Sequence, residues 1–248
     1  MKIGLLGVGN IGGTLAKRLP TAGHDVKVAN SRGPETIDRS LLATGARAVT
    51  AEDAARDVDA LILSIPLKRL PGVAELISSL PPETVGVDTS NYYPLRDGSI
   101  EAIEGGQPES EWASQQLGRP IVKAWNAVGS GTFADRALPA GHPDRLAIPI
   151  AGDDPRAKEV AATLMDDSGF DAVDAGSIAD SWRQQPGSPA YCTELTAAEL
   201  PAALESAQRE RLPKRRDFAA AILNERMEDP AAGLDSDYAV RLSRMIYM

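Results

Sequence analysis

Three glycines near the amino terminus, Gly7, Gly9 and Gly12, have the spacing G-x-G-x-x-G. They directly follow a short apolar run, residues 2–6, and they open a segment with helical periodicity. Glycine allows bare backbone N–H groups to approach an anion closely at the positive end of a helix. The motif therefore predicts a turn that binds the pyrophosphate of a dinucleotide, with Asn10 and Ile11 in the first turn of the helix.

The residues after the second predicted strand distinguish two forms of dinucleotide. Roughly twenty residues past the glycines, a protein that binds NAD offers a carboxylate to the ribose 2′-hydroxyl, and that carboxylate would repel a 2′-phosphate. Here the residues are Asn30, Ser31 and Arg32. The planar fork of an arginine matches phosphate oxygens, so we predict NADP(H) as the bound nucleotide. The alternative is a solvated loop arginine, and the nearby acidic residue Glu35 keeps that alternative open.

Short apolar runs alternate with amphipathic stretches over the first part of the chain, which is typical of βαβ units. Strands are expected at residues 2–6, 25–29, 46–49, 60–65, 85–89 and 121–125, and helices at 11–22, 52–56, 70–80 and 111–117. Residues 94–110 are polar and glycine-rich, which predicts a loop. Six parallel strands complete a Rossmann doubly wound sheet, an α/β fold that we assign to an NADP-binding domain at residues 1–140.

The pattern changes after residue 140. Two further strands, at 145–152 and 170–176, flank a helix at 155–168, which predicts a second, smaller α/β domain at residues 141–248. The remainder is mostly helical in pattern and is expected to give this domain a helical tail, with a short helix at 218–227 and a tail at residues 233–248.

Composition limits the class of protein. Hydrophobic residues make up 43% of the 248 residues and the net charge is -9, so the chain is not of a disordered type and we expect neither nucleic-acid nor membrane partners. The chain opens with MKIGLLGVG, from which we expect no targeting segment. The single cysteine cannot form an internal disulfide, from which we expect a cytoplasmic location, and one cysteine with two distant histidines gives no metal-ligand spacing. The sequence does not determine the oligomeric state, although a homodimer is the commonest assembly.

Several short stretches resemble the family of NADPH-dependent coenzyme F420 reductases and their relatives, the oxidoreductase domains of membrane metalloreductases. The resemblance covers approximately residues 1–200, and its specific part consists of Gly7-Val8-Gly9-Asn10-Ile11-Gly12, Asn30-Ser31-Arg32-Gly33-Pro34, Ser64-Ile65-Pro66, Asp88-Thr89-Ser90-Asn91 and Lys123-Ala124-Trp125-Asn126. It implies a nicotinamide ring over the carboxyl ends of the central strands, with the ring of a hydride acceptor, F420 or a flavin, stacked against it.

The resemblance also implies which residues surround the rings. By position these are Ser64, Ile65 and Pro66 after the fourth strand, Asn91 after the fifth, and Asn126 and Ala127 after the sixth. Hydride transfer between two such rings requires little acid–base help, so no catalytic residue is assigned. The basic run Lys214-Arg215-Arg216 is either a contact for the anionic tail of F420 or, as is more usual, a solvated helix face.

Other chemistries fit the sequence less well. Tyr92, Tyr93 and Tyr191 each lack the lysine four residues later that a short-chain dehydrogenase requires. A hydroxyacid dehydrogenase of the 6-phosphogluconate type would place a catalytic lysine and an asparagine four residues apart on a helix. Lys123 and Asn126 are three residues apart and are expected on opposite faces of a strand, with Lys123 as a simple strand-end residue. A reductase of a small imine or carbonyl substrate stays open as an alternative, and so does a non-catalytic NADPH sensor. Cys192 is expected to be a packed side chain rather than a nucleophile.

Overall fold

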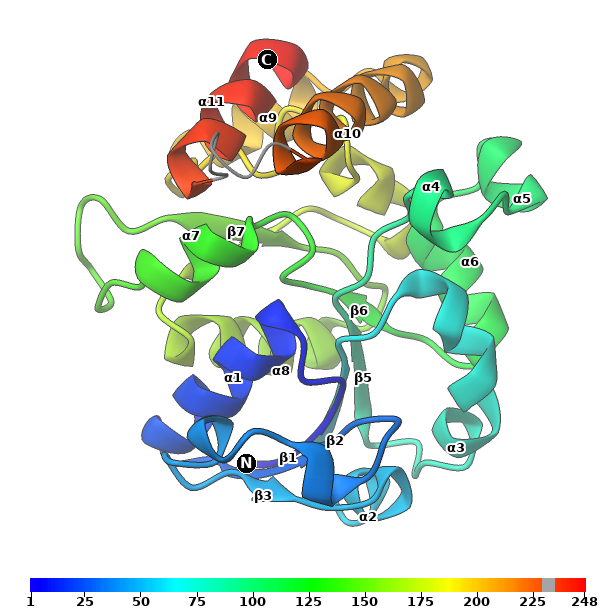
Figure 1. Cartoon of the computed structure of the whole chain (residues 1–248), viewed down its shortest axis with the longest axis vertical. Coiled ribbons are helices and arrows are strands. Elements are labelled where there is room, and N and C mark those ends of the chain that lie inside the picture. Colours follow the sequence, from blue (N-terminus) through cyan, green and yellow to red (C-terminus); the bar gives the residue numbers. More distant parts are fainter. Residues whose placement is uncertain (229–234) are drawn as a thin grey trace.

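The computed structural model describes residues 1–228 and 235–248. Its centre is a parallel six-stranded sheet with the strand order β3-β2-β1-β4-β5-β6, flanked by helices on both faces (Figure 1). The strands are β1 (Lys2–Leu6), β2 (Asp25–Ala29), β3 (Arg47–Ala48), β4 (Ala60–Leu63), β5 (Val85–Asp88) and β6 (Val122–Lys123). The order reverses between β1 and β4, which confirms the predicted Rossmann doubly wound fold.

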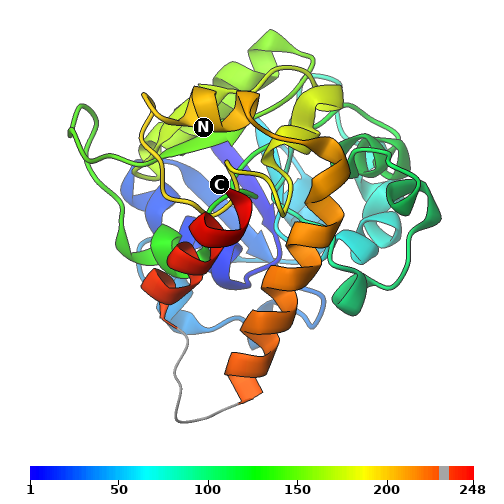
Figure 2. The same ribbon diagram turned by 90° about the horizontal axis from the view of Figure 1, so that it is seen from above.

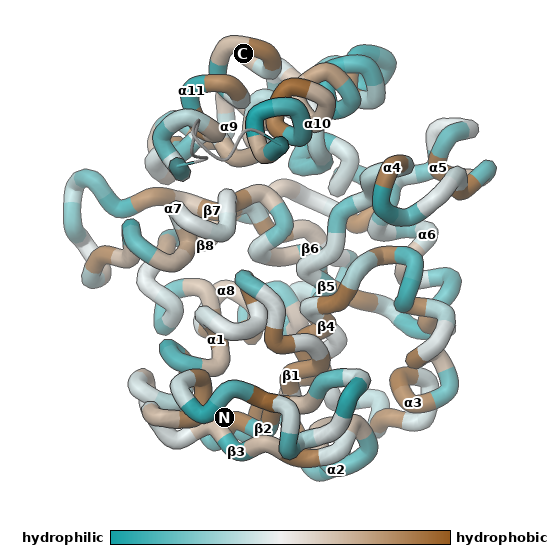
Figure 3. The backbone as a smooth tube through the Cα atoms, viewed as in Figure 1, coloured by the Kyte–Doolittle hydropathy of each residue, from teal (hydrophilic) through white to brown (hydrophobic). Residues whose placement is uncertain are grey.

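Alternating side chains of the strands pack against a helical layer on each face of the sheet. Ile3 and Leu5 belong to one apolar cluster, together with residues of α1 (Asn10–Thr21) and α8 (Pro155–Asp167). Leu6 and Leu61 belong to a second cluster on the other face, with residues of α2 (Ala51–Ala55), α3 (Ala74–Ser78) and α6 (Glu109–Leu117). Figure 3 shows the apolar strands at the centre, as a sheet buried on both faces requires.

A smaller two-stranded parallel sheet follows, formed by β7 (Ala147–Ile150) and β8 (Asp171–Asp174). An antiparallel bridge joins Lys123 at the end of β6 to Ala151, with the two backbone N–H···O bonds measuring 2.8 and 3.1 Å. The smaller sheet therefore continues the edge of the large one. The short helix α7 (Ser130–Asp135) lies in the connection between the two sheets.

The last part of the chain is helical. It comprises α9 (Leu200–Glu205), α10 (Leu212–Glu228) and α11 (Ser236–Tyr247). The helix expected at 218–227 is part of α10, which begins earlier, directly before Pro213. Figures 1 and 2 show α10 and α11 lying across the end of the molecule above the sheet, and the two helices contact each other. Residues 236–247 of the predicted helical tail form the helix α11, but this helix packs onto the molecule, because it buries Val240, Leu242 and Tyr247; residues 233 and 234 lie outside the described residues.

The segment 94–110 is also more ordered than the predicted loop. It contains α4 (Pro94–Asp97), α5 (Glu101–Glu104) and the start of α6. The buried Tyr92 hydroxyl holds this segment, since it donates to Glu104 Oε1 at 2.7 Å and accepts from the backbone N–H of Ile100 at 3.1 Å. Tertiary contacts of a single side chain, rather than helical periodicity, therefore fix these short turns.

Candidate functional site

The glycines in the turn between β1 and α1 have two different structural roles. Gly7 has a φ of 99°, and a Cβ there would lie 2.2 Å from the carbonyl oxygen of Ser64. A Cβ on Gly12 would lie 2.0 Å from the carbonyl oxygen of Gly7. By contrast, Gly9 is exposed, and a Cβ added to it would have no neighbour within 4 Å. Gly7 and Gly12 are thus required by the packing of the turn, whereas Gly9 leaves open space beside the helix end.

That open space faces the amino terminus of α1. Gly9 is the N-cap residue, its cap has no side-chain hydrogen bond, and the first turn contains no acidic residue. The first N–H groups of a helix have no partner within the helix, and they carry the positive end of its dipole. An uncapped helix start beside an open glycine fits a pyrophosphate group.

The turn after β2 presents Ser31 and Arg32 to solvent. Asn30 orders it, because its side-chain oxygen accepts from the backbone N–H of Arg32 at 2.9 Å and its side-chain nitrogen donates to Thr36 at 2.9 Å. Within the described part of the chain, the Arg32 guanidinium has no ion pair. The carboxylate of Glu35 lies beside Gly33, where an added Cβ would be 2.5 Å from Oε1. The loop thus contains a cation that is available to bind a phosphate, and also a carboxylate that would repel one.

A cleft, called the main cleft below, opens at the carboxyl ends of the strands, as in other doubly wound sheets. Its volume is about 370 Å³, and it is lined by the first turn of α1, the segments after β4 and β5, Trp125, Asn126, residues 128–130, and Tyr191 and Cys192. Arg96 is the one charged side chain among the described residues of this lining. A cleft with so few charged groups is suited to a ligand that carries its own reactivity.

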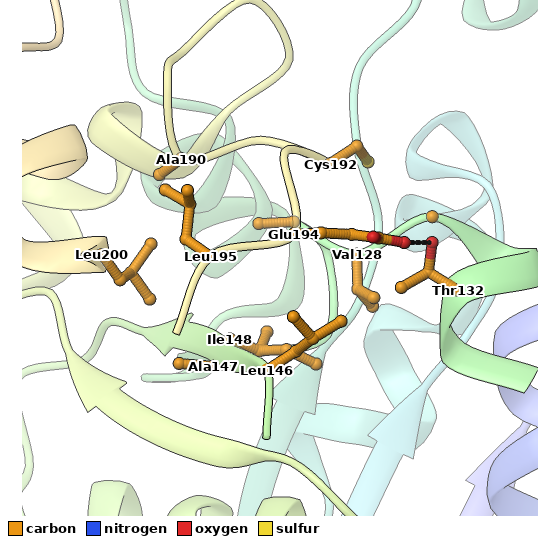
Figure 4. A pocket seen from close by; sticks show the side chains of 12 residues that line it. Val128, Thr132, Leu146, Ala147, Ile148, Ala190, Cys192, Glu194, Leu195 and Leu200 are labelled. Carbon is orange, nitrogen blue, oxygen red and sulfur yellow. Dashed lines mark hydrogen bonds between the residues drawn. The ribbon is translucent and has the colours of Figure 1, made fainter. Parts of the chain in front are cut away.

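The structure brings most of the residues predicted from the sequence to this cleft. Those that line it are Gly9, Asn10, Ile11, Ser64, Ile65, Pro66, Asn91 and Asn126. Ala127 is buried and lines a smaller adjoining cavity, shown in Figure 4. In that cavity Thr132 donates to Glu194 at 2.7 Å. Asn30, Ser31 and Arg32 lie outside the cleft lining, but the glycine turn adjoins their strand through the bond from the Gly7 N–H to the Ala29 carbonyl, at 2.8 Å.

Buried amides hold the floor of the cleft. Asn126 is 1% exposed; its side-chain nitrogen donates to Asn91 Oδ1 at 3.1 Å and to the carbonyl oxygen of Gln184 at 2.8 Å. The Gln184 side chain returns a bond to Asn126 Oδ1 at 2.8 Å. Gln184 was not predicted as part of the site, because it lies 58 residues from Asn126 in the sequence and only the fold brings the two amides together.

Two tyrosine hydroxyls and a thiol line the cleft beside the amides. The hydroxyls of Tyr93 and Tyr191 lie 2.8 Å apart. Burial raises the pKa of both phenols well above the ordinary value, and burial raises the pKa of the Cys192 thiol to about 12. All three groups therefore keep their protons at neutral pH, which makes Cys192 a poor nucleophile.

Lys123 departs from its predicted role. It is fully buried, and its ammonium pairs with Asp88 Oδ2 at 2.7 Å and also donates to the carbonyl oxygen of Ser90. Strand β6 ends at Lys123, so Asn126 lies in the following turn rather than on the same strand. Lys123 is therefore a buried support for the loop after β5 and not a simple strand-end residue.

The basic run in α10 does not form one exposed patch. Arg216 is 5% exposed, its guanidinium lies 5.2 Å from the centre of the Tyr92 ring, and its Nε donates to Asp217 at 2.8 Å. Lys214 is exposed. None of Lys214, Arg215 and Arg216 lines the main cleft.

Fold and site together define a dinucleotide-binding domain of the Rossmann type, and comparison with known proteins finds a family match for its first part. Residues 2–92 match the model of the family described as NADP oxidoreductase, coenzyme F420-dependent. The resemblance expected from the sequence is thereby confirmed for this part of the chain, which is a domain of pyridine-nucleotide oxidoreductases. The relation to membrane metalloreductases stays a prediction.

Individual relatives cover different parts of the chain. YjhV of Escherichia coli (strain K12) is 50% identical over 80 residues, which are 31% of this chain and 58% of that protein. The structure of the hypothetical protein SMa0349 from Sinorhizobium meliloti has a TM-score of 0.67 at 27% identity and covers 79% of this chain and 95% of that one. A proposed F420-dependent NADP reductase from Arthrobacter sp. FB24 has a TM-score of 0.56 at 20% identity over 90% of this chain and 94% of that one. The last likeness is one of fold.

No helix in 1–228 or 235–248 has both the length and the apolar character needed to cross a membrane. Nor do these residues contain a group of three or more His, Cys, Asp or Glu side chains placed to hold a metal ion.

Proposed function

We propose that the chain is an NADP(H)-dependent oxidoreductase that transfers hydride between the nicotinamide and a planar ring acceptor such as F420 or a flavin. Gly9 and the start of α1 hold the pyrophosphate, and Ser31 and Arg32 contact the 2′-phosphate. The nicotinamide supplies the hydride when it is bound. The chain's own residues bind and orient the two ligands and exclude water between them.

One observation carries this proposal above the others. The described lining of the main cleft contains no histidine, carboxylate or lysine, and Arg96 is its one charged group. Its tyrosines and its thiol hold their protons because burial raises each pKa. Transfer between two rings needs no general acid or base, so this lining supports a ring acceptor over a substrate that requires fast proton delivery.

Turnover is the test. Pure protein is incubated without oxygen with NADPH and, separately, F420, flavin mononucleotide, a naphthoquinone or the cyclic imine 1-pyrroline, while the absorbance of reduced nicotinamide is followed. We expect oxidation with F420 or the flavin. Gly9→Val serves as a control for contaminating activity, because a side chain at this position fills the space needed by the pyrophosphate. Oxidation with 1-pyrroline alone would establish an imine reductase instead, and tight NADPH binding with no oxidation would favour the sensor.

A further inference from the structure

A chain of hydrogen bonds crosses the floor of the cleft, and backbone carbonyls fix its direction. Gln184 Nε2 donates to the carbonyl oxygen of Pro149 at 3.1 Å, and Asn126 Nδ2 donates to the carbonyl oxygen of Gln184 at 2.8 Å. Asn91 Nδ2 donates to the carbonyl oxygen of Asn126 at 2.9 Å. A carbonyl oxygen can only accept, so each of these three amides must present its nitrogen there. The orientation of all three side chains is thereby determined.

Once the three amides are oriented, the side-chain hydrogen bonds between them all have the same donor-to-acceptor direction, from Gln184 towards Tyr191. Gln184 Nε2 donates to Asn126 Oδ1 at 2.8 Å, and Asn126 Nδ2 donates to Asn91 Oδ1 at 3.1 Å. Asn91 Nδ2 then donates to the Tyr191 hydroxyl at 3.2 Å. The Tyr191 oxygen is thus an acceptor for the amide, and its single proton is available for its next neighbour.

That neighbour is the Tyr93 hydroxyl, 2.8 Å away. The sulfur of Cys192 also adjoins Tyr191, but a thiol is a weak acceptor, and an oxygen at this distance is the better one. When Tyr191 donates to Tyr93, the Tyr93 proton has no acceptor among the described residues. Burial raises the pKa of both phenols, so each remains a neutral donor rather than a base.

The unused proton lies at a suitable place for a ligand. Tyr93 lines the main cleft and also an adjoining groove formed with Pro94, Leu95 and the α10 residues Leu223 and Met227. A ligand wider than the nicotinamide ring therefore has space in both the cleft and the groove that Tyr93 borders.

We propose that Tyr93 donates a hydrogen bond to a carbonyl oxygen or ring nitrogen of the hydride acceptor, and that Tyr191, Asn91 and Asn126 direct its proton there. The assignment rests on the proposed function and narrows it, because the acceptor must carry such an atom where it meets Tyr93. A donor at this place also favours the reduced ligand, on which negative charge increases when it receives the hydride from NADPH.

The experiment compares three phenylalanine variants. Tyr93→Phe removes the terminal donor, and Tyr191→Phe breaks the chain while it leaves the Tyr93 hydroxyl in place. Tyr238→Phe is the matched control, because Tyr238 lies on α11 outside the cleft lining and the variant keeps the ring that packs against Arg226. The probe is oxidised 5-deazariboflavin, titrated by fluorescence into protein saturated with NADP⁺. NADP⁺ binding and NADPH oxidation are measured for the same proteins.

Tyr93→Phe is expected to weaken deazaflavin binding by about 3- to 10-fold and to lower kcat, with NADP⁺ binding unchanged. Tyr191→Phe is expected to have a smaller effect, and Tyr238→Phe none. If the wild type oxidises NADPH with the deazaflavin and Tyr93→Phe matches it in binding and rate, the role of Tyr93 is overturned and the proposed function stands. If the wild type neither binds nor reduces any ring acceptor, both proposals are overturned.

Discussion

The carbonyl oxygen of Gly7 lies so close to the α carbon of Gly12 that a Cβ at position 12 would come within 2.0 Å of it. This contact holds the start of α1 against the end of β1, and it leaves no room for even a methyl group. Gly9, between the two, has open space instead. The motif therefore contains positions that serve folding and a position that serves binding.

Substitutions should separate these two roles. Gly12→Ala is expected to lower the free energy of unfolding by about 1–3 kcal/mol without any nucleotide, because the backbone must move to admit the methyl group. Gly9→Val is expected to change it by less than about 1 kcal/mol and to weaken NADP⁺ binding about 100-fold. Urea unfolding and calorimetric titration measure both quantities. Normal nucleotide affinity in Gly9→Val would remove the pyrophosphate from this turn.

Arg32 is expected to determine the preference for the phosphorylated nucleotide. Arg32→Ala removes a charge-assisted hydrogen bond to the 2′-phosphate, so NADP⁺ should bind about 10- to 100-fold more weakly while NAD⁺ binding changes little. Arg39→Ala, which removes an exposed arginine from the next turn, is the matched control and should leave both affinities unchanged. Equal losses for the two nucleotides, or no loss for NADP⁺, would show that Arg32 does not read the phosphate.

Glu109 should make stability depend on pH. Burial raises the pKa of its carboxyl to about 7 from an ordinary value of 4.5. Between these values the folded state keeps a proton that the unfolded state has lost, so stability is greatest below pH 4.5 on this account and falls as pH rises towards 7. The size of this contribution is roughly 3 kcal/mol. It is constant above about pH 7.

Replacing the carboxyl by an amide should remove that dependence. Urea unfolding of Glu109→Gln is expected to show a flatter pH profile between pH 5 and 8 than the wild type. Glu101→Gln, a change at an exposed carboxyl in α5, should retain the wild-type profile. Parallel profiles for all three proteins would mean that Glu109 is ionised in the folded state over this whole range.

Local patterns predicted the parts of the site that depend on neighbours in sequence. The strand, the glycine turn and the helix of the first βαβ unit follow from residues that are adjacent in the chain. Tyr93 and Tyr191 are 98 residues apart, and only the fold brings their hydroxyls together. The buried pairing of Lys123 with Asp88 was missed for the same reason, since a lysine in a short apolar run has the same appearance whether its partner is solvent or a carboxylate.

The carboxyl-terminal helix was harder to predict because packing, rather than helical periodicity, defines it. In α11, Asp235 is the N-cap and accepts from the backbone N–H of Tyr238 at 2.6 Å, a capping signal that was present in the sequence but overlooked. Tyr247 is 3% exposed, and its ring lies 6.4 Å from that of Tyr191 at the cleft. A segment predicted as a tail thus supports the wall of the candidate site.

Isotope transfer tests the central claim most directly. NADPH carrying deuterium at C4, in either the pro-R or the pro-S position, is oxidised by the protein with 5-deazariboflavin, whose reduced C5 carbon retains the label. We expect deuterium from one of the two positions to appear on C5 of the deazaflavin, and the other to remain in NADP⁺. Reduced deazaflavin that contains no deuterium from either nucleotide, or no reduction at all, would contradict direct hydride transfer between two rings held in this cleft.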